Sequence, residues 1–414
     1  MDGNAAITKR TFHGATAQLQ RLCTAITDCH HSTPNWAESG WIVVRSENIK
    51  RGRISLNNVS YSDEATFQQR ISRSVPEPGD LIVTREAPMG EVGMIPDGVR
   101  CCLGQRLVLV KPNPSEVDRY YLLYAMQSDF VQKQIRASDE TGSTVSNLRI
   151  PALKELSIPL LDRADEIGAV LAALDAKIDL NNRINAELEA LAKTIYDYWF
   201  VQFDFPDAHG RPYKSSGGAM VWNDIPKREI PAGWCGDSLG NIVENLDSKR
   251  VPLSKQQREQ RPGSVPYYGA TGLMGYVDDF LFDEELLLLA EDGSVVDIRG
   301  KVVLQRIWGK AWVNNHAHVL RPRSGWTVDL LYHALRDVPA IRMMSGSIQK
   351  KITQDNLNAI RILVAPDPIR RSLAQILRSL SERQKNASKE SGRLTRLRDW
   401  LLPLLMNGQV RVAG

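Results

Sequence analysis

The sequence predicts an α+β protein with two similar mixed domains and two long helices that pair as an antiparallel coiled coil, giving a pseudo-two-fold internal repeat. Three observations predict this fold class. Groups of residues recur in the same order in both halves of the 414-residue chain. Two stretches carry apolar residues at helical spacing. Hydrophobic residues make up 43% and charged residues 24% of the chain, as in ordinary globular domains, and the length suits two or three of them.

The first domain is expected over residues 1–160, where 18 Lys and Arg face 17 Asp and Glu. Within it, Asp80–Thr84 and Leu107–Val110 have the continuous apolar character of buried strands. Turn signals such as Pro78-Gly79 surround them, and a short helix is expected near Tyr120–Gln127. These elements indicate a mixed domain built mainly of irregularly connected strands.

The first long helix is expected within residues 161–205, which hold 4 basic and 9 acidic residues. Asn181 and Asn185 fall on its apolar stripe, where polar residues fix the register of a coiled coil at some cost in stability. The stripe comprises Ile167, Leu171, Leu174, Ile178, Leu188, Ile195 and Trp199, with Ile184 and Leu191 alongside.

The second domain is expected over residues 206–365, with 20 basic and 18 acidic residues. Its buried strands are expected at Leu286–Ala290 and Val302–Leu304, and a short helix near Leu330–Arg336. The order of elements is that of the first domain.

The second long helix is expected within residues 366–414, which hold 10 basic and 4 acidic residues. Pro368 suits a first helical turn, and Gly408 suits the end. Two separate surface helices are the alternative, but opposite charge, similar length and a shared period favour pairing. The stripe comprises Ile369, Leu373, Ile376, Leu380, Ala387, Leu394, Leu397, Leu401 and Leu404.

The repeat consists of five groups of matches whose offset drifts slowly from 220 to 204, as in a diverged duplication with loop insertions. Leu19 and Leu22 match Leu239 and Ile242; Lys111-Pro112 matches Arg321-Pro322; Leu122–Tyr124 matches Leu330–Tyr332; Gly142-Ser143 matches Gly346-Ser347; and Leu148, Leu153, Leu156 and Ile158 match Ile352, Leu357, Ile360 and Ile362.

The order domain, helix, domain, helix has a geometric consequence. If the helices pair antiparallel, the two domains are expected at opposite ends of a rod. A helix of about 38 residues spans roughly 57 Å at ~1.5 Å per residue. One turn of duplex DNA is ~34–36 Å, so two similar domains on such a spacer suit the reading of two separated half-sites.

Several classes of protein are excluded or disfavoured. The densest apolar run, Leu286–Ala290, is too short to span a membrane, and residues 1–10 lack the apolar core of a signal peptide. Five irregularly spaced cysteines indicate reduced thiols and a cytoplasmic protein. The sequence has no phosphate-binding P-loop, no amino-methyltransferase tetrad and no Glu-x-Lys nuclease motif. Asp247-Ser248-Lys249 imitates the last only loosely, and a solvated loop is the more economical interpretation.

Two groups of cysteines and histidines are candidates for binding a metal ion or DNA. Cys23, Cys29 and His30-His31 lack the second close pair that a zinc site needs, so no metal is expected. His316 and His318 alternate on one expected strand. Their alternatives are a polar strand face or contact with DNA bases and phosphates.

Basic, amide-rich loops recur in both domains and suit DNA, because Arg and Lys bind phosphate and guanine while Gln and Asn bind adenine edges. The runs are 50–53, 68–73 and 133–136 in the first domain, and 249–261 and 342–351 in the second.

Residues 195–206 (IYDYWFVQFDFP) and 212–218 (PYKSSGG) resemble the central conserved region of type I restriction–modification specificity (S) subunits. Residues 265–272 (VPYYGATG), 275–279 (GYVDD), 290–293 (AEDG) and 315–322 (NHAHVLRP) are similar to their target-recognition domains. Residues 79–86 (GDLIVTRE) agree more loosely. The resemblance covers the chain from about residue 18 to its end.

The resemblance implies a non-catalytic, sequence-specific DNA-binding subunit. Each target-recognition domain would read one half of a bipartite, asymmetric site on double-stranded DNA, and the helices would set the spacing and dock two methyltransferase subunits. Restriction (motor) subunits would join this core. S-adenosylmethionine, ATP and magnesium would be held by the partner subunits, with no cofactor in this chain.

The residues expected to contact DNA lie in both domains. Ser143 and Ser347 follow the repeated glycines, where amides at a helix start could hold a phosphate, although a structural turn is an equal alternative. The full set is Arg51, Arg53, Arg106, Ser143, Thr144, Lys255, Arg258, Tyr268, Ser347 and Lys350. A self-contained nuclease or methyltransferase, and a coiled-coil scaffold that binds no nucleic acid, remain as competing functions.

Overall fold

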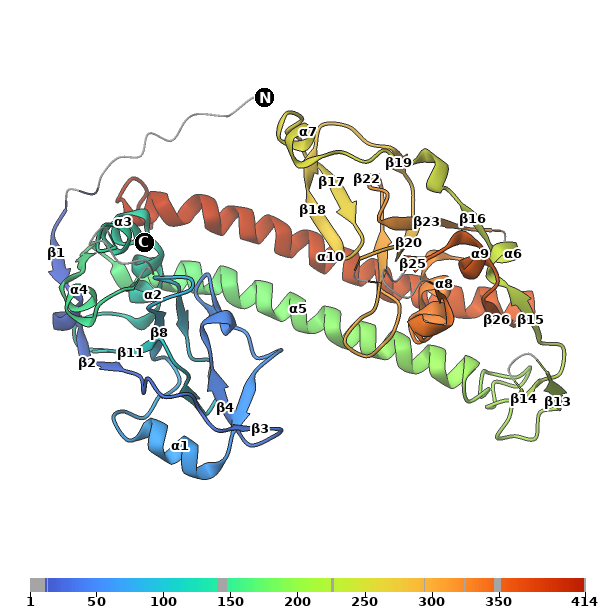
Figure 1. The fold of residues 1–414 in the computed structure, drawn as a ribbon, viewed down its shortest axis with the longest axis horizontal. Helices are drawn as coiled ribbons and strands as arrows, with labels where there is room; N and C mark the ends of the chain where they lie inside the picture. Colours follow the sequence, from blue (N-terminus) through green and yellow to red (C-terminus); the bar gives the residue numbers. More distant parts are fainter. Residues whose placement is uncertain are drawn as a thin grey trace. The chain divides into compact units, whose positions relative to one another are not determined.

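The computed structural model describes residues 12, 14–139, 147–224, 227–293, 295–323, 325–345 and 351–412. The chain forms two compact units, residues 1–181 with 389–414, and residues 182–388. Helix α5 (Ala164–Phe200) lies within the predicted segment 161–205, and helix α10 (Asp367–Met406) lies within 366–414. Each unit therefore contains one mixed domain together with half of each long helix (Figure 1).

The first unit has a central antiparallel sheet in the order β2-β11-β8-β9. A second sheet has the order β10-β4-β7-β3, in which β10 runs parallel to β4. The remaining strands form two antiparallel pairs, β1 with β12 and β5 with β6. The strands are β1 Thr16–Gln18, β2 Cys23–Asp28, β3 Trp36–Ala37, β4 Trp41–Val44, β5 Ile49–Lys50, β6 Arg53–Ile54, β7 Ser60–Ser62, β8 Leu81–Thr84, β9 Val92–Met94, β10 Cys101–Leu103, β11 Leu107–Pro112 and β12 Ser157–Pro159.

Strand β11 shows why this domain has continuous apolar runs. Val108 and Val110 pack in the cluster that includes helix α2 (Arg119–Gln127), whereas Leu107 and Leu109 pack with residues of β4 and β10. Successive side chains of a strand point to opposite faces, so both faces of this sheet are covered. The predicted strands and helix of the first domain are confirmed. The other helices are α1 Glu64–Ile71, α3 Asp129–Ala137 and α4 Ile150–Glu155.

The second unit repeats this plan. Its central sheet has the order β16-β23-β20-β21, and its second sheet the order β18-β17-β22-β19, with β17 parallel to β22. Three antiparallel pairs, β13 with β14, β15 with β26 and β24 with β25, complete it. The strands are β13 Met220–Asn223, β14 Arg228–Pro231, β15 Cys235–Ser238, β16 Val243–Asn245, β17 Val265–Gly269, β18 Gly272–Val277, β19 Phe282–Asp283, β20 Leu286–Ala290, β21 Leu304–Ile307, β22 Lys310–Val313, β23 Ala317–Pro322, β24 Met344–Ser345, β25 Lys351–Ile352 and β26 Arg361–Val364.

Strand β20 is a run of leucines, which favour helices, yet it is a fully buried strand. Leu287 and Leu289 pack in the cluster of helix α8 (Val328–Leu335), and Leu286 and Leu288 pack with β22. Burial on both faces therefore overrides helix propensity. The strand predicted at Val302–Leu304 was placed too early, because β21 begins at Leu304. The short helices are α6 Leu239–Ile242, α7 Lys255–Glu259 and α9 Gln354–Asn358.

The internal repeat is confirmed in the order of the strands. Strands β2, β11, β8 and β9 correspond to β16, β23, β20 and β21, and helix α2 corresponds to α8. The matched residues occupy the same places: Lys111-Pro112 and Arg321-Pro322 end the equivalent strands β11 and β23. Leu148 and Ile352 are both completely buried.

The long helices pack against each other antiparallel in each unit. In the first, Asp175 pairs with Arg398 (2.6 Å), and Asn181 donates to Glu390 (2.8 Å). In the second, Asn185 donates to Ser388 (3.1 Å). The two asparagines predicted on the stripe thus meet the partner helix.

The apolar surface of the helices is wider than their seam. Leu397, predicted on the stripe, is 41% exposed, and the seam position is taken by Arg398, which is buried against Asp175. On α5, Ile184 and Leu191 are also exposed. Among the described residues, no helix combines the length and apolar character needed to cross a membrane.

Candidate nucleic-acid interface

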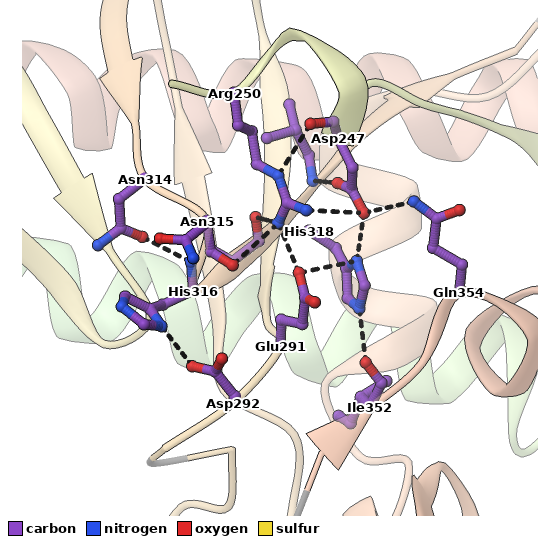
Figure 2. A network of polar contacts seen from close by, with 12 residues as sticks. Asp247, Arg250, Glu291, Asp292, Asn314, Asn315, His316, His318, Ile352 and Gln354 are labelled. Carbon is purple, nitrogen blue, oxygen red and sulfur yellow. Dashed lines mark hydrogen bonds and ion pairs between the residues drawn. The ribbon is translucent and has the colours of Figure 1, made fainter. Parts of the chain in front are cut away.

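A buried polar network lies at the start of strand β23 (Figure 2). His318, 1% exposed, accepts or donates at both ring nitrogens: Nδ1 lies 2.6 Å from Oδ2 of Asp247, and Nε2 lies 2.8 Å from the carbonyl oxygen of Ile352. A carboxylate and a carbonyl oxygen both accept hydrogen bonds, so each ring nitrogen of His318 faces an acceptor. The alternation of His316 and His318 thus separates an exposed from a buried side chain.

The carboxylates of the network are held ionised. Burial raises the pKa of Asp247, but the hydrogen bonds from His318, Gln354 and the Val319 amide outweigh it and lower that pKa to about 2. Burial likewise opposes the ionisation of Glu291, and hydrogen bonds from Lys351 and Arg250 lower its pKa.

Asp247, Glu291 and His318 form the one grouping of potential metal ligands among the residues that the structure describes. Arg250 lies 2.6 Å from Glu291, and Lys351 lies 2.8 Å from the other oxygen of the same carboxylate. Because cationic side chains already balance both acids, we interpret the cluster as an ion-pair network. Asp247, expected in a solvated loop, is 8% exposed.

Strand β23 begins just after a pair of exposed residues, Asn315 and His316. The Nδ1 of His316 lies 2.5 Å from Oδ1 of Asp292, which follows strand β20. The buried network and this exposed pair therefore occupy the same end of the central sheet, as Figure 2 shows.

The predicted contact residues of the first domain have different surroundings. Arg51 lies in the turn between β5 and β6 with a φ of 48° and is exposed. Arg106 is exposed beside Glu86, with 3.0 Å between Nε and Oε2. Arg53 instead pairs with Asp175 (2.8 Å) and Asp179 (2.6 Å) of helix α5, so its guanidinium is engaged within the unit.

In the second domain, Lys255 and Arg258 lie on helix α7. The Lys255 side chain is 84% exposed, whereas Arg258 lies over the ring of Tyr267 at 4.9 Å. Tyr268 is half-buried on β17, and burial raises its pKa. Ser143, Thr144, Ser347 and Lys350 lie outside the described residues.

Two runs singled out in the sequence are partly internal. In the basic run 249–261, Arg250 belongs to the buried network, and Arg261 pairs with Asp278 at 2.8 Å. Of the cysteine–histidine group, Cys29 is buried and its Sγ accepts from the Leu107 amide at 3.3 Å. The network could not be predicted from the sequence, because Asp247 and His318 are brought together only by the pairing of distant segments.

Comparison with known proteins gives a consistent result. The family model described as type I restriction modification DNA specificity domain matches residues 38–190 and again 231–396. The chain is 24% identical over 357 residues to the type I restriction enzyme MjaIX specificity subunit of Methanocaldococcus jannaschii, covering 81% of this chain and 78% of that one.

A putative MjaX specificity subunit of the same organism is 23% identical over 412 residues, covering 95% of this chain and 93% of the relative. The solved S subunit from M. genitalium shares the fold with a TM-score of 0.57 at 18% identity, covering 97% of each chain. Two matches to the family model cover most of the sequence, one in each half. The chain therefore belongs to the family of type I restriction–modification DNA specificity subunits and carries the specificity domain twice.

Proposed function

We propose that the first domain of this specificity subunit reads the 5′ half, and the second domain the 3′ half, of a split asymmetric DNA site. The observation that carries the proposal is the repetition of one domain plan on a single chain, with equivalent central sheets. Two related but different surfaces suit two half-sites of different sequence. The specificity subunit is not itself the catalyst; its task is to select the DNA.

Methylation would be supplied by two methyltransferase subunits that dock on the long helices. The exposed apolar side chains of α5, Leu180, Ile184 and Leu191, support this part of the proposal, since they recur at helical spacing on a surface that would otherwise be polar. Restriction subunits would join that core. S-adenosylmethionine, ATP and magnesium belong to these partners, and the complex acts in the cytoplasm.

Charge suggests why the partners matter for DNA affinity. The segments 1–160 and 206–365 carry net charges of only +1 and +2. Non-specific DNA affinity comes mainly from neutralising phosphates, so nearly neutral domains contribute little of it. We expect the partners to supply most of the affinity and this chain to supply the choice of sequence.

The test is methylation mapping of host DNA with and without an intact copy of this gene. A bipartite motif that disappears on deletion supports the proposal and identifies the target. Unchanged methylation, with functional methyltransferase subunits present, would contradict it. Exchanging residues 206–365 for those of a relative should alter only one half of the motif.

Competing functions make different predictions. A self-contained nuclease or methyltransferase would turn over as the purified chain with magnesium or S-adenosylmethionine. A scaffold without nucleic acid would show no salt-sensitive retention on DNA even with its partners, whereas phosphate contacts make retention fall steeply with salt.

A further inference from the structure

The two domains share a backbone arrangement at one end of their central sheets. The amide of Arg85 donates to the carbonyl of Arg106 (2.8 Å), and in the second domain the amide of Glu291 donates to that of His316 (2.9 Å). Strand register gives the same equivalence, since Thr84 pairs with Leu107 as Ala290 pairs with Ala317. Arg106 and His316 are therefore structurally equivalent residues.

Each of these residues belongs to a two-residue segment between buried stretches of two successive strands. Residues 101–104 and 107–110 are buried, and so are residues 311–314 and 317–320. Between them lie Gln105 and Arg106 in the first domain, and Asn315 and His316 in the second. Arg106, Asn315 and His316 are exposed, whereas Gln105 is half-buried and its amide donates to the carbonyl of His31 (2.5 Å). We call the pairs Gln105-Arg106 and Asn315-His316 the reading turns.

We propose that the two reading turns are equivalent specificity-determining positions, one for each half-site. The inference rests on the proposed function and adds residues to it: Asn315, His316 and Gln105 join Arg106. Their side chains carry the donors and acceptors that discriminate purine edges in the major groove.

Neighbouring carboxylates orient both turns. Glu86 lies 3.0 Å from Arg106, and Asp292 lies 2.5 Å from His316. These acids occupy equivalent places, each following the central strand by two residues. The Glu86 carboxylate next to the Arg106 guanidinium weakens the attraction of that cation to arbitrary phosphates, which favours the reading of bases over binding to the DNA backbone.

The reading turn of the first domain also lines a depression with a volume of about 440 Å³. Gln105 and Arg106 share it with Arg45 and with Trp36, whose side chain is half exposed and lies under the Arg45 guanidinium at 5.5 Å. The lining combines an exposed indole, an amide and two guanidinium groups, and Arg45 also pairs with Glu47 of the same lining at 2.8 Å. The remaining donors and the indole suit the edge of a nucleic acid.

In both domains a nitrogen-bearing side chain bonds an aspartate and a backbone carbonyl behind the reading turn. We call this set of hydrogen bonds the relay. In the first domain, Arg85 bonds Asp28 (3.0 Å) and donates from Nε to the carbonyl of Leu148 (3.1 Å). In the second, His318 bonds Asp247 (2.6 Å) and donates to the carbonyl of Ile352 (2.8 Å).

The backbone amides of Leu148 and Ile352, whose carbonyls accept these bonds, complete the relay. Leu148 donates to the carbonyl of Arg85, and Ile352 donates to that of Glu291, each at 2.9 Å. The relay thus fixes the residue whose amide holds the reading turn. Asp28 and Asp247 are positioning residues in this arrangement.

The test uses the assembled complex of this chain with its methyltransferase partners and duplexes of the mapped motif with single base-pair changes in either half. The measured quantity is discrimination, the ratio of Kd for altered and intact duplex. The double variant Asn315→Ala/His316→Ala should lose about tenfold discrimination in one half-site and none in the other. Gln105→Ala/Arg106→Ala should show the mirror result. Arg299→Ala, an exposed cation of the second domain, is the control that keeps both ratios.

Positioning is tested by Asp247→Asn against Asp329→Asn. Both aspartates are buried in the second domain, and Asp329 instead pairs with Arg306 at 2.9 Å. Asp247→Asn should lower discrimination at the same base pairs as the reading-turn variant, while Asp329→Asn should lower only thermal stability. Equal loss of discrimination in both would overturn the positioning role.

The reading turns would be refuted if both double variants kept full discrimination, or weakened binding equally on intact and altered duplexes. Failure of methylation mapping to yield a bipartite motif would instead refute the proposed function, so the two failures are distinguishable.

Discussion

Arg53 lies 2.8 Å from Asp175, and this ion pair fastens strand β6 to helix α5. Asp175 also binds Nη1 of Arg398 on helix α10 and the hydroxyl of Tyr124 on α2, each at 2.6 Å. One carboxylate therefore connects the domain with both helix segments of the first unit.

Replacing that carboxylate should destabilise the first unit. Asp175→Ala leaves two guanidinium groups and a buried hydroxyl without their shared acceptor. We expect a loss of about 2 kcal/mol, below the value for a fully buried pair because Arg53 keeps some contact with water. Urea unfolding of the chain measures the loss. Asp179→Ala, which removes the more exposed partner of Arg53, is the matched control and should cost less than about 0.5 kcal/mol; equal losses would contradict the role of Asp175.

Acid should weaken the second unit through Asp247. Its folded-state pKa, about 2, lies below the ordinary value of 3.8, so the bound carboxylate favours folding above pH 4. That contribution, about 2 kcal/mol, is lost as pH falls from about 4 towards 2. Thermal unfolding across this range should show a smaller acid dependence for Asp247→Asn than for the native chain. An unchanged dependence would exclude Asp247 as its source.

His333 should produce an acid effect in a different pH range. It is 2% exposed, neither ring nitrogen has a hydrogen-bond partner among the described residues, and burial lowers its pKa to about 3. Its folded pKa lies below the ordinary 6.5, so the unfolded chain binds the proton first and stability falls as pH drops below about 6.5.

The variant His333→Phe keeps a ring beside Tyr196, whose centroid lies 5.7 Å from that of His333. Relative to the native chain it should gain about 2 kcal/mol between pH 7.5 and pH 5. Chemical unfolding at the two pH values measures the difference. A gain that does not change with pH would show that packing, and not protonation, is responsible.

An acidic side chain on the exposed face of α5 should prevent docking of the methyltransferase. Leu191 is 47% exposed, so Leu191→Glu should change the stability of the chain by no more than about 0.5 kcal/mol. Burying that carboxylate in an apolar interface should weaken assembly at least about tenfold. Analytical ultracentrifugation of the mixed subunits tests this. Ala186→Glu adds the same charge on another exposed side of α5 and should assemble normally.

Local patterns determined what the sequence could predict. The apolar stripes of α5 and α10 and the doubly buried strands β8, β11 and β20 can be recognised because each pattern lies within one continuous segment of the sequence. The helical period predicts Leu397 on the stripe because its side chain is apolar, but Leu397 is exposed and the neighbouring Arg398 packs between the helices because it pairs with Asp175. The helical period shows which side chains are apolar, but it does not show which residues they contact.

Partners far along the chain could not be predicted. Arg53 and Asp175 are separated by 122 positions, and Asp247 and His318 by 71. Both pairs depend on strand register and on how a domain packs on a helix. The sequence predicts that Arg106 contacts DNA, but the equivalence of Arg106 with His316 follows only from the hydrogen bonds that their carbonyls accept from Arg85 and Glu291.

The relays also bear on how such a chain can diverge. Arg85 and Glu291 occupy equivalent positions and have opposite charge, and in the second domain the side chain that bonds the aspartate is His318, whose counterpart is Val108. Substituting either position alone would remove a hydrogen-bond partner of Asp28 or of Asp247. The two positions, which lie on neighbouring strands, are therefore expected to change together. An alignment of the two halves, residue by residue, would show this coupled change as two unrelated mismatches.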